Sequence, residues 1–321
     1  MSSLRVKVFY ATDIHGSEKC FRKFLNAQKI YGVNILILGG DITGKMLIPI
    51  IEKHDGSYEA EFMGSKVSVR AQDELKNLIK NIADTGSYPY LCDEDEYYRL
   101  STDKFYLDRI FKEQVIKRIE CWIKLAEERL YNLKPKPEVY IMPGNDDYPE
   151  VGRVLENSNL IINPEEKIVE LGGKYEMISI GFSNITPWRS PRETSEEKLE
   201  EKLENLASKL KRVSESIFNV HIPPHNTPID LAPLLDNTLK PILSGGQLLM
   251  THVGSIAVRR VIEKYQPLVG LHGHIHESRG IVKIGKTLCV NPGSDYLAGN
   301  LQGAILTLEN GKVKTYILTV G

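Results

Sequence analysis

The sequence contains no apolar run that approaches the ~18 residues needed to span a membrane as a helix, so we expect no membrane segment. Its cysteines are few, four in 321 residues, and they lack the CxxC spacing typical of zinc sites and redox pairs. We therefore expect reduced thiols in a cytoplasmic protein. The chain passes from Met1 almost directly into a predicted strand, without the pattern of a signal peptide.

The sequence also has no excess of charge of either sign. Lysine and arginine total 41 against 42 acidic residues, for a formal net charge of −1. This balance argues against bulk binding to nucleic acid or to an anionic membrane. A hydrophobic fraction of 41% with 26% charged residues is typical of a soluble globular protein. The length suits one α/β domain, and we predict a single domain over residues 1–321.

What the sequence does contain is a histidine motif at the end of an apolar, strand-like segment. Leu268–Leu271 is followed by Gly273, His274 and His276. In an extended chain, residues two apart face the same side, so both histidines can face one point. Imidazole is a favoured ligand of transition metals. The motif therefore predicts a metal ligand pair, and the alternative is a surface loop that happens to be rich in histidine.

Four other predicted strands end in the same way. The side chains that follow them are Asp13 and His15 after residues 4–11, Asp41 after 34–38, Asn145 after 138–142 and His221 after 216–220. In open α/β sheets, ligands bind beyond the carboxyl ends of the strands, so we expect these groups to converge. Singly, each has an ordinary explanation: a helix N-cap, a turn residue or a hydrogen-bonded core histidine. Five such clusters together favour one shared site.

Residues 45–137 interrupt the strand–helix alternation. We predict a hairpin around Gly64, a helix over 71–83 and a long amphipathic helix within 103–133. The acidic run at 93–96 is expected to be a solvated loop. We interpret the region as a largely helical insertion packed over the edge of the core, and a lid over the site is the alternative.

The last third of the chain is rich in predicted hairpins. Segments 281–290 and 301–320 each suit two antiparallel strands, the second turning at Asn310-Gly311; earlier in the chain, 167–180 is a predicted hairpin that turns at Gly172-Gly173. We expect the late hairpins to build a second, more antiparallel sheet.

One motif suggests a different chemistry. Residues 39–45 match the GxxxxGK pattern of a phosphate-binding loop after a strand. However, Met46 replaces the expected hydroxyl residue, Asp41 would put negative charge in an anion site, and Pro49 falls in the helix that should follow. We therefore treat nucleotide binding through Lys45 as the weakest alternative.

Taken in order, the Asp-x-His, Gly-Asp, Gly-Asn-Asp, His and Gly-His-x-His motifs resemble those of the calcineurin-like metallophosphoesterase superfamily. The resemblance implies an α/β fold in which two mixed β-sheets pack as a sandwich flanked by α-helices. It implies two metal ions, the first held by Asp13, His15, Asp41 and His276. The second would be held by Asp41, Asn145, His221 and His274, with Asp41 bridging the pair.

The charge of this set agrees with a two-metal centre. Two divalent cations bring four positive charges, whereas the set contains only two carboxylates, so the centre stays electron-poor and can polarise phosphoryl oxygens. Nitrogen and oxygen ligands of this kind accept manganese, our first choice, or iron, zinc, cobalt or nickel. A single structural zinc would require a closed site, usually with cysteine, and no cysteine lies near these motifs.

The sequence departs from the family at Asp146. Many relatives have there a histidine that touches the phosphate, whereas an ionised aspartate repels phosphate unless a partner neutralises it. His252 and His225 are the candidate partners or proton donors. We prefer His252, which follows a predicted strand and precedes a helix, and we predict that it works with Asp146 in catalysis. A structural role is the alternative for either histidine.

We predict a metal-dependent phosphoesterase that favours phosphodiesters over monoesters and acts on a phosphoester small molecule or a nucleotide-like substrate. The rival is a scaffold of the same fold that binds proteins and has lost catalysis, although a scaffold has no need of seven suitable ligands. Trp188 is expected to pack in the core, with a place in the wall of the pocket as the alternative.

Overall fold

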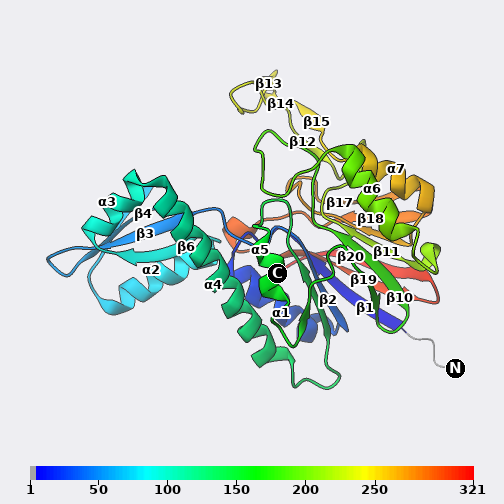
Figure 1. Cartoon of the computed structure of the whole chain (residues 1–321), viewed down its shortest axis with the longest axis horizontal. Helices are drawn as coiled ribbons and strands as arrows, with labels where there is room; N and C mark the ends of the chain where they lie inside the picture. Colours follow the sequence, from blue (N-terminus) through cyan, green and yellow to red (C-terminus); the bar gives the residue numbers. More distant parts are fainter. Residues whose placement is uncertain (1–4) are drawn as a thin grey trace.

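The computed structural model describes residues 5–321, and its centre is a sandwich of two six-stranded mixed β-sheets (Figure 1). The first sheet has the order β20-β19-β1-β2-β7-β8. Its strands are β1 (Arg5–Ala11), β2 (Ile35–Gly39), β7 (Glu138–Met142), β8 (Ile161–Ile162), β19 (Gln302–Glu309) and β20 (Lys312–Val320). Leu4, with which the first strand was predicted to begin, lies outside the described residues.

The second sheet has the order β17-β18-β16-β11-β10-β9. Its strands are β9 (Ile168–Leu171), β10 (Tyr175–Ile180), β11 (Ile217–Val220), β16 (Val269–Leu271), β17 (Gly280–Ile284) and β18 (Thr287–Asn291). The side chains of β1 show how the layers form, because successive residues of a strand face opposite sides. Val6, Val8 and Tyr10 pack between the two sheets, whereas Phe9 and Ala11 pack on the other side, under helices.

Helices cover both outer faces of the sandwich. Helices α1 (Glu18–Tyr31), α4 (Lys104–Leu130) and α5 (Glu150–Leu155) pack on the first sheet. Helices α6 (Glu196–Ala207) and α7 (Ile256–Tyr265) pack on the second. Ser17 caps α1 by accepting a hydrogen bond from the Cys20 amide, as the sequence predicted. The predicted fold class is confirmed. No helix within residues 5–321 is long and apolar enough to cross a bilayer.

The strands that precede the polar motifs run parallel to one another. In the first sheet β1 pairs with β2 and β2 with β7, and in the second β11 pairs with β10 and β16, all in parallel. Their carboxyl ends therefore meet at one edge of each sheet, where a ligand site is expected.

The region between β2 and β7 has a sheet of its own, which stands to one side of the sandwich (Figure 1). Its order is β5-β4-β3-β6, formed by β3 (Leu47–Glu52), β4 (Tyr58–Phe62), β5 (Ser65–Val69) and β6 (Tyr88–Cys92). Helices α2 (Gln72–Asp84) and α3 (Glu94–Thr102) accompany it. Sequence analysis predicted only the β4–β5 hairpin, because Pro49 and Pro89 mask the other two strands. The acidic run begins α3, capped by Asp93, instead of forming a loop.

The predicted hairpins are confirmed, but the place of the two late ones in the fold differs from the prediction. The pairs β9–β10, β17–β18 and β19–β20 are antiparallel. They do not form a separate sheet, since β17–β18 extends the second sheet and β19–β20 extends the first. Two short ribbons form an arm above the sandwich: β12 (Leu231–Pro233) with β15 (Met250–His252), and β13 (Leu243–Ser244) with β14 (Gln247–Leu248).

Trp122 anchors the long helix α4 to the sandwich, and its removal should destabilise the protein. Its ring is 3% exposed, stacks on Phe21 with centroids 4.1 Å apart, and donates a hydrogen bond from Nε1 to Glu18 at 3.0 Å. We expect Trp122→Ala to lower the free energy of unfolding in urea by about 3–5 kcal/mol. Phe105→Ala on the same helix, where the ring is 90% exposed, should change it by less than about 0.5 kcal/mol. Equal effects of the two substitutions would contradict this packing.

Candidate metal centre

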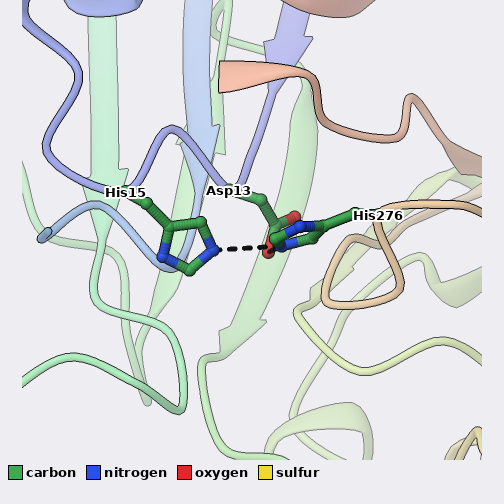
Figure 2. Close-up of side chains that lie close together, drawn as sticks. All are labelled: Asp13, His15 and His276. Atoms are coloured by element: carbon green, nitrogen blue, oxygen red, sulfur yellow. Dashed lines mark hydrogen bonds and ion pairs between the residues drawn. The ribbon is translucent and has the colours of Figure 1, made fainter. Parts of the chain in front are cut away.

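The first group of candidate ligands comes from the loops after β1 and β16 (Figure 2). The side chains of Asp13, His15 and His276 point toward one another, and one potential ligand atom from each lies within 4.8 Å of the others. The two imidazole Nε2 atoms are 3.0 Å apart, and that of His276 is 3.4 Å from Asp13 Oδ1. Two imidazole nitrogens that face each other so closely need either a proton or a cation between them.

The second group adjoins the first through Asp41. Asp41, His221 and His274 also place ligand atoms within 4.8 Å of one another. The Oδ1 atom of Asp41 lies 3.4 Å from His221 Nε2, and its Oδ2 atom lies 3.9 Å from His15 Nε2 in the first group. Asn145 completes the second group, with Oδ1 2.7 Å from His274 Nδ1. The structure therefore brings all seven predicted ligands together, with Asp41 between the two groups.

Four of these residues have a backbone conformation that is rare outside glycine. The φ angles are 54° at Asp13, 38° at His15, 49° at Asp41 and 65° at His274. Left-handed conformations cost free energy for residues with a Cβ atom and cluster at functional sites. Here the strained loops follow three core strands and turn the side chains inward.

Two glycines allow these loops to approach one another. A Cβ atom at Gly144 would collide with the Asp41 amide nitrogen, and one at Gly273 would collide with Asp13 Oδ2. Any other residue at either position would displace a candidate ligand.

The two carboxylates of the site are buried and face histidines. Asp13 is 1% and Asp41 2% exposed, and within residues 5–321 their recorded ion-pair partners are all imidazoles. Burial alone would raise the pKa of both carboxyl groups, but the neighbouring histidines, His221 first, outweigh it and hold both pKa values well below the usual range. The site therefore carries two negative charges that attract a cation.

The histidines respond to this charge in two ways. Burial lowers the pKa of His15 and of His274 to about 4, so both are neutral and can act as ligands. Burial also opposes the charged form of His221, but Asp41 and Asp13 raise its pKa to about 10. His221 thus holds the proton that balances the carboxylates when no metal is bound.

The residues present fit a metal pair. The Nδ1 atom of His221 lies 2.9 Å from the carbonyl of Gly39, which fixes the ring and leaves Nε2 directed at Asp41 and Asp13. This Nε2 atom is buried and has no hydrogen-bond partner among the described residues. Carboxylates, imidazoles and one amide oxygen form a donor set that suits manganese, iron, zinc or cobalt.

Asp147 ties together two loops of the site, and sequence analysis assigned it no role. It is fully buried and accepts hydrogen bonds from the amides of Ile42, Thr43 and Gly144 at 3.0, 2.8 and 2.6 Å. These bonds tie the loop after β2 to the loop after β7. An aspartate in a turn is too common to reveal this role from sequence alone.

Asp146 has a different partner from the one that we predicted. Its Oδ2 atom lies 2.5 Å from Lys45 Nζ, and its Oδ1 atom accepts a hydrogen bond from Ser190. Burial lowers the pKa of Lys45, but Asp146 raises it by more, so the lysine is charged. Of the two roles considered for His252 and His225, that of the partner that neutralises Asp146 is therefore taken by Lys45, and that of the proton donor stays a prediction. Lys45 was considered only as part of a phosphate-binding loop, and that loop leads into β3 instead of a helix.

His252 and His225 belong to another cluster, built around a buried aspartate. Asp230 is 0% exposed and accepts hydrogen bonds from the amides of Thr227 and Gly254 at 2.8 and 3.0 Å. Its two oxygens lie 2.7 Å from His252 Nδ1 and 3.7 Å from His225 Nδ1. A carboxylate at Nδ1 orients an imidazole and leaves Nε2 available. The catalytic roles of Asp146 and His252 stay predictions.

A cavity of about 1060 Å³ joins these features. Its wall includes Asp41, Asn145, His274 and His276 from the candidate ligands, and also Lys45, Asp146, His225, His252 and Trp188. Trp188 is 65% exposed, so the expectation that it packs in the core is wrong and the alternative, a place in the wall, is correct.

Comparison with known proteins connects the chain to an archaeal relative. It is 38% identical over 168 residues to the uncharacterized protein MJ1162 of Methanocaldococcus jannaschii, a match that covers 51% of this chain and 68% of that protein. This chain belongs to the MJ1162 family. No family model matches the sequence.

This member of the MJ1162 family shares its fold with solved structures. The protein TT1561 of Thermus thermophilus aligns with 98% of each chain at a TM-score of 0.51 and 14% identity, which supports the sandwich fold alone. A weaker likeness, with a TM-score of 0.33 and 12% identity over 97% of this chain and 98% of the other, is found to YfcE, a phosphoesterase from E. coli. Such likenesses do not decide the function, so the function has to be inferred from the geometry of the site.

Gly144→Ala should disable the metal centre of this MJ1162-family protein although it replaces no candidate ligand. The new methyl group would push the Asp41 loop away from Asn145. Wild-type protein should melt at a higher temperature when Mn²⁺ is added, since an ion that binds only the folded state stabilises it, and the variant should lose that rise. Gly64→Ala is the control for backbone strain without a collision, because Gly64, unlike Gly144, has a positive φ but has open space around it. It should cost about 1–2 kcal/mol of stability and keep the rise; a full rise in Gly144→Ala would contradict the arrangement.

Proposed function

We propose that this protein is a dinuclear-metal-dependent phosphoesterase that hydrolyses phosphodiesters in preference to monoesters. One observation carries the proposal: two groups of buried ligand atoms share Asp41 and open into one large cavity. Asp13, His15 and His276 would hold one ion and Asn145, His221 and His274 the other, with Asp41 between them. Manganese is our first choice of ion, with iron, zinc, cobalt or nickel as alternatives.

The chemistry expected of the ions is that of other paired-metal sites. When bound, two divalent cations would offset negative charge on the phosphoryl oxygens and lower the pKa of a nearby water. The residues of the chain have the remaining tasks of binding the phosphate, placing it and supplying a proton.

Lys45 is suited to bind the phosphate. Its ammonium group lies on the cavity wall beside the ligand groups, and Asp146 holds it there. A charged lysine donates strong hydrogen bonds to phosphoryl oxygens. We infer that Lys45 supplies the positive charge at the position where many metallophosphoesterases use a histidine.

Asp146 explains the preference for diesters. A phosphomonoester carries between one and two negative charges near neutral pH, whereas a diester carries one. Because the Asp146 carboxylate offsets the charge of Lys45, the pair attracts the more highly charged monoester less strongly than a free cation would. Asp146 thus has two proposed effects: it holds the Lys45 ammonium group in place, and it makes the site favour the less highly charged ester.

His252 is the proposed proton donor to the departing oxygen. Asp230 orients the ring through Nδ1, and the ring lies on the wall of the same cavity. This arrangement supports general acid catalysis in the way that a carboxylate supports histidine in other hydrolases.

The cysteines support a reducing compartment. All four are free thiols, and Cys20, Cys92 and Cys289 are buried. We propose a cytoplasmic location on this ground.

The proposal predicts metal-dependent hydrolysis of bis-p-nitrophenyl phosphate. With Mn²⁺ present, kcat/KM for this diester should exceed that for p-nitrophenyl phosphate at least about fivefold, since an additional unit charge near Asp146 costs about 1 kcal/mol or more. A chelator should abolish both activities. His221→Asn should lose activity, whereas His54→Asn, at an exposed position in the β3–β4 turn, should retain it. If neither ester is hydrolysed with any divalent metal, the proposal is contradicted and a protein-binding scaffold is favoured.

The Lys45–Asp146 pair predicts a change in substrate preference. Lys45→Gln should reduce kcat/KM for the diester by about tenfold to a hundredfold, as expected for loss of a charged phosphate contact, and Lys45→Arg should restore part of it. Asp146→Asn should raise monoester hydrolysis relative to diester hydrolysis. Lys53→Gln, which removes an ion pair with Glu94 in the insertion, is the matched control. An unchanged diester-to-monoester ratio in Asp146→Asn would exclude charge selection by this residue.

A further inference from the structure

The part of the cavity beyond the candidate ligands is walled by large apolar side chains that have no cover. Ile185 is 69% and Trp188 65% exposed on the segment between β10 and α6. Leu234 and Leu239 of the arm are 38% and 47% exposed, and Ile256 at the start of α7 is 44% exposed. Exposed apolar residues that gather in a concave site, instead of scattering over the surface, indicate a binding site.

This apolar wall and the candidate ligands belong to one continuous space. The wall of the same cavity of about 1060 Å³ includes Asp41, Asn145, His274 and His276. A phosphate held there would direct one of its ester groups along the apolar wall. The volume is at the upper end of the ~300–1000 Å³ found for small-molecule sites, so it can contain a phosphate and a bulky organic group together.

The polar side chains in this part of the wall are largely engaged within the protein. Thr186 Oγ1 donates to Glu193 at 2.5 Å, and Glu196 accepts hydrogen bonds from Ser255 Oγ at 2.5 Å and from the Ala257 amide at 2.8 Å. His252 has its Nδ1 atom bound to Asp230. The wall therefore offers area for hydrocarbon, and within residues 5–321 the exposed guanidinium of Arg189 is a polar group of this wall without a side-chain partner.

We propose that the substrate is a phosphodiester in which one ester group is a bulky hydrocarbon, an alkyl chain or an aryl ring, bound against Trp188, Ile185 and Leu234. The inference rests on the proposed function and adds the class of substrate. Burial of apolar surface against this wall provides the binding energy, while the phosphate is held beside the candidate ligands.

A substrate series with a constant leaving group tests this assignment. The probes are p-nitrophenyl diesters whose second ester group is methyl, phenyl, octyl or thymidine. We expect kcat/KM for the phenyl or octyl ester to exceed that for the methyl ester at least about tenfold, and the thymidine ester to gain much less. A gain for phenyl alone assigns an aryl group and a gain for octyl an alkyl chain. A larger gain for thymidine than for either would overturn the inference.

Variants of exposed residues test whether the apolar wall of the cavity, and not the rest of the arm, binds the ester group. Leu234→Ala and Trp188→Ala should each remove most of the advantage of the octyl or phenyl ester and leave the methyl ester within about twofold. Leu243→Ala is the matched control, because Leu243 lies on the same arm, is 63% exposed and does not line the cavity. Equal effects of Leu234→Ala and Leu243→Ala would overturn the assignment.

Binding can be measured without turnover, because the chain has two tryptophans and Trp122 is buried. Octylphosphonate should shift the fluorescence of Trp188 to shorter wavelength in a saturable manner, methylphosphonate should not, and Trp188→Phe should lose the signal. Such binding without hydrolysis of any diester would support the apolar site and overturn the proposed function. Hydrolysis with no preference among methyl, phenyl and octyl would overturn the apolar site and leave the proposed function standing.

Discussion

Asp13 and Asp41 hold two negative charges inside the protein, with imidazoles as their ion-pair partners in the described chain. Burying a carboxylate is costly unless a counter-charge accompanies it. Lysine and arginine provide that charge in ordinary ion pairs, but Lys45, the lysine beside this site, pairs with Asp146, so a proton on His221 provides it. A divalent cation bound by the same groups would supply the counter-charge in place of the proton, and the need for this counter-charge organises the site.

The fold positions the candidate ligands in a way that the side chains alone could not. Parallel strands bring their carboxyl ends to the sheet edges, and strained turns at Asp13, His15, Asp41 and His274 aim the side chains inward. Glycines let the loops approach to contact distance, and Asp147 ties two of them together. Strain of this kind persists only where the surrounding structure stabilises it, and the two apolar layers around the sheets supply that stability.

The resemblance to a known family implied the sandwich, whereas sequence reasoning found the seven candidate ligands because they follow a local rule. Apolar strands ending in small residues and ligand-type side chains are visible in short windows, and parallel sheets then bring the ends together. The strands β3 and β6 were not predicted because a proline in each interrupts the strand pattern. The late hairpins were found, but their sheet was not, since local sequence does not specify which edge a hairpin joins.

The parts of the site that were missed depend on distant pairs. Lys45 and Asp146 are a hundred residues apart, and neither has a periodic or motif signal that names the other. Asp230 was not predicted to orient His252, and Trp188 was expected in the core because tryptophans usually pack there. The wall of the resulting cavity combines candidate metal ligands with exposed apolar side chains. This combination is a property of the three-dimensional structure, and it is what suggests a class of substrate.

The central claim is that the seven side chains around Asp41 bind a pair of metal ions. Elemental analysis of the purified protein, after incubation with manganese and removal of free ions, tests it most directly. The account predicts about two divalent ions per chain in the wild type, and a marked loss of both in Asp41→Asn because that carboxylate faces both groups. A protein that retains no metal, or that binds equally well without the Asp41 carboxylate, would contradict the account.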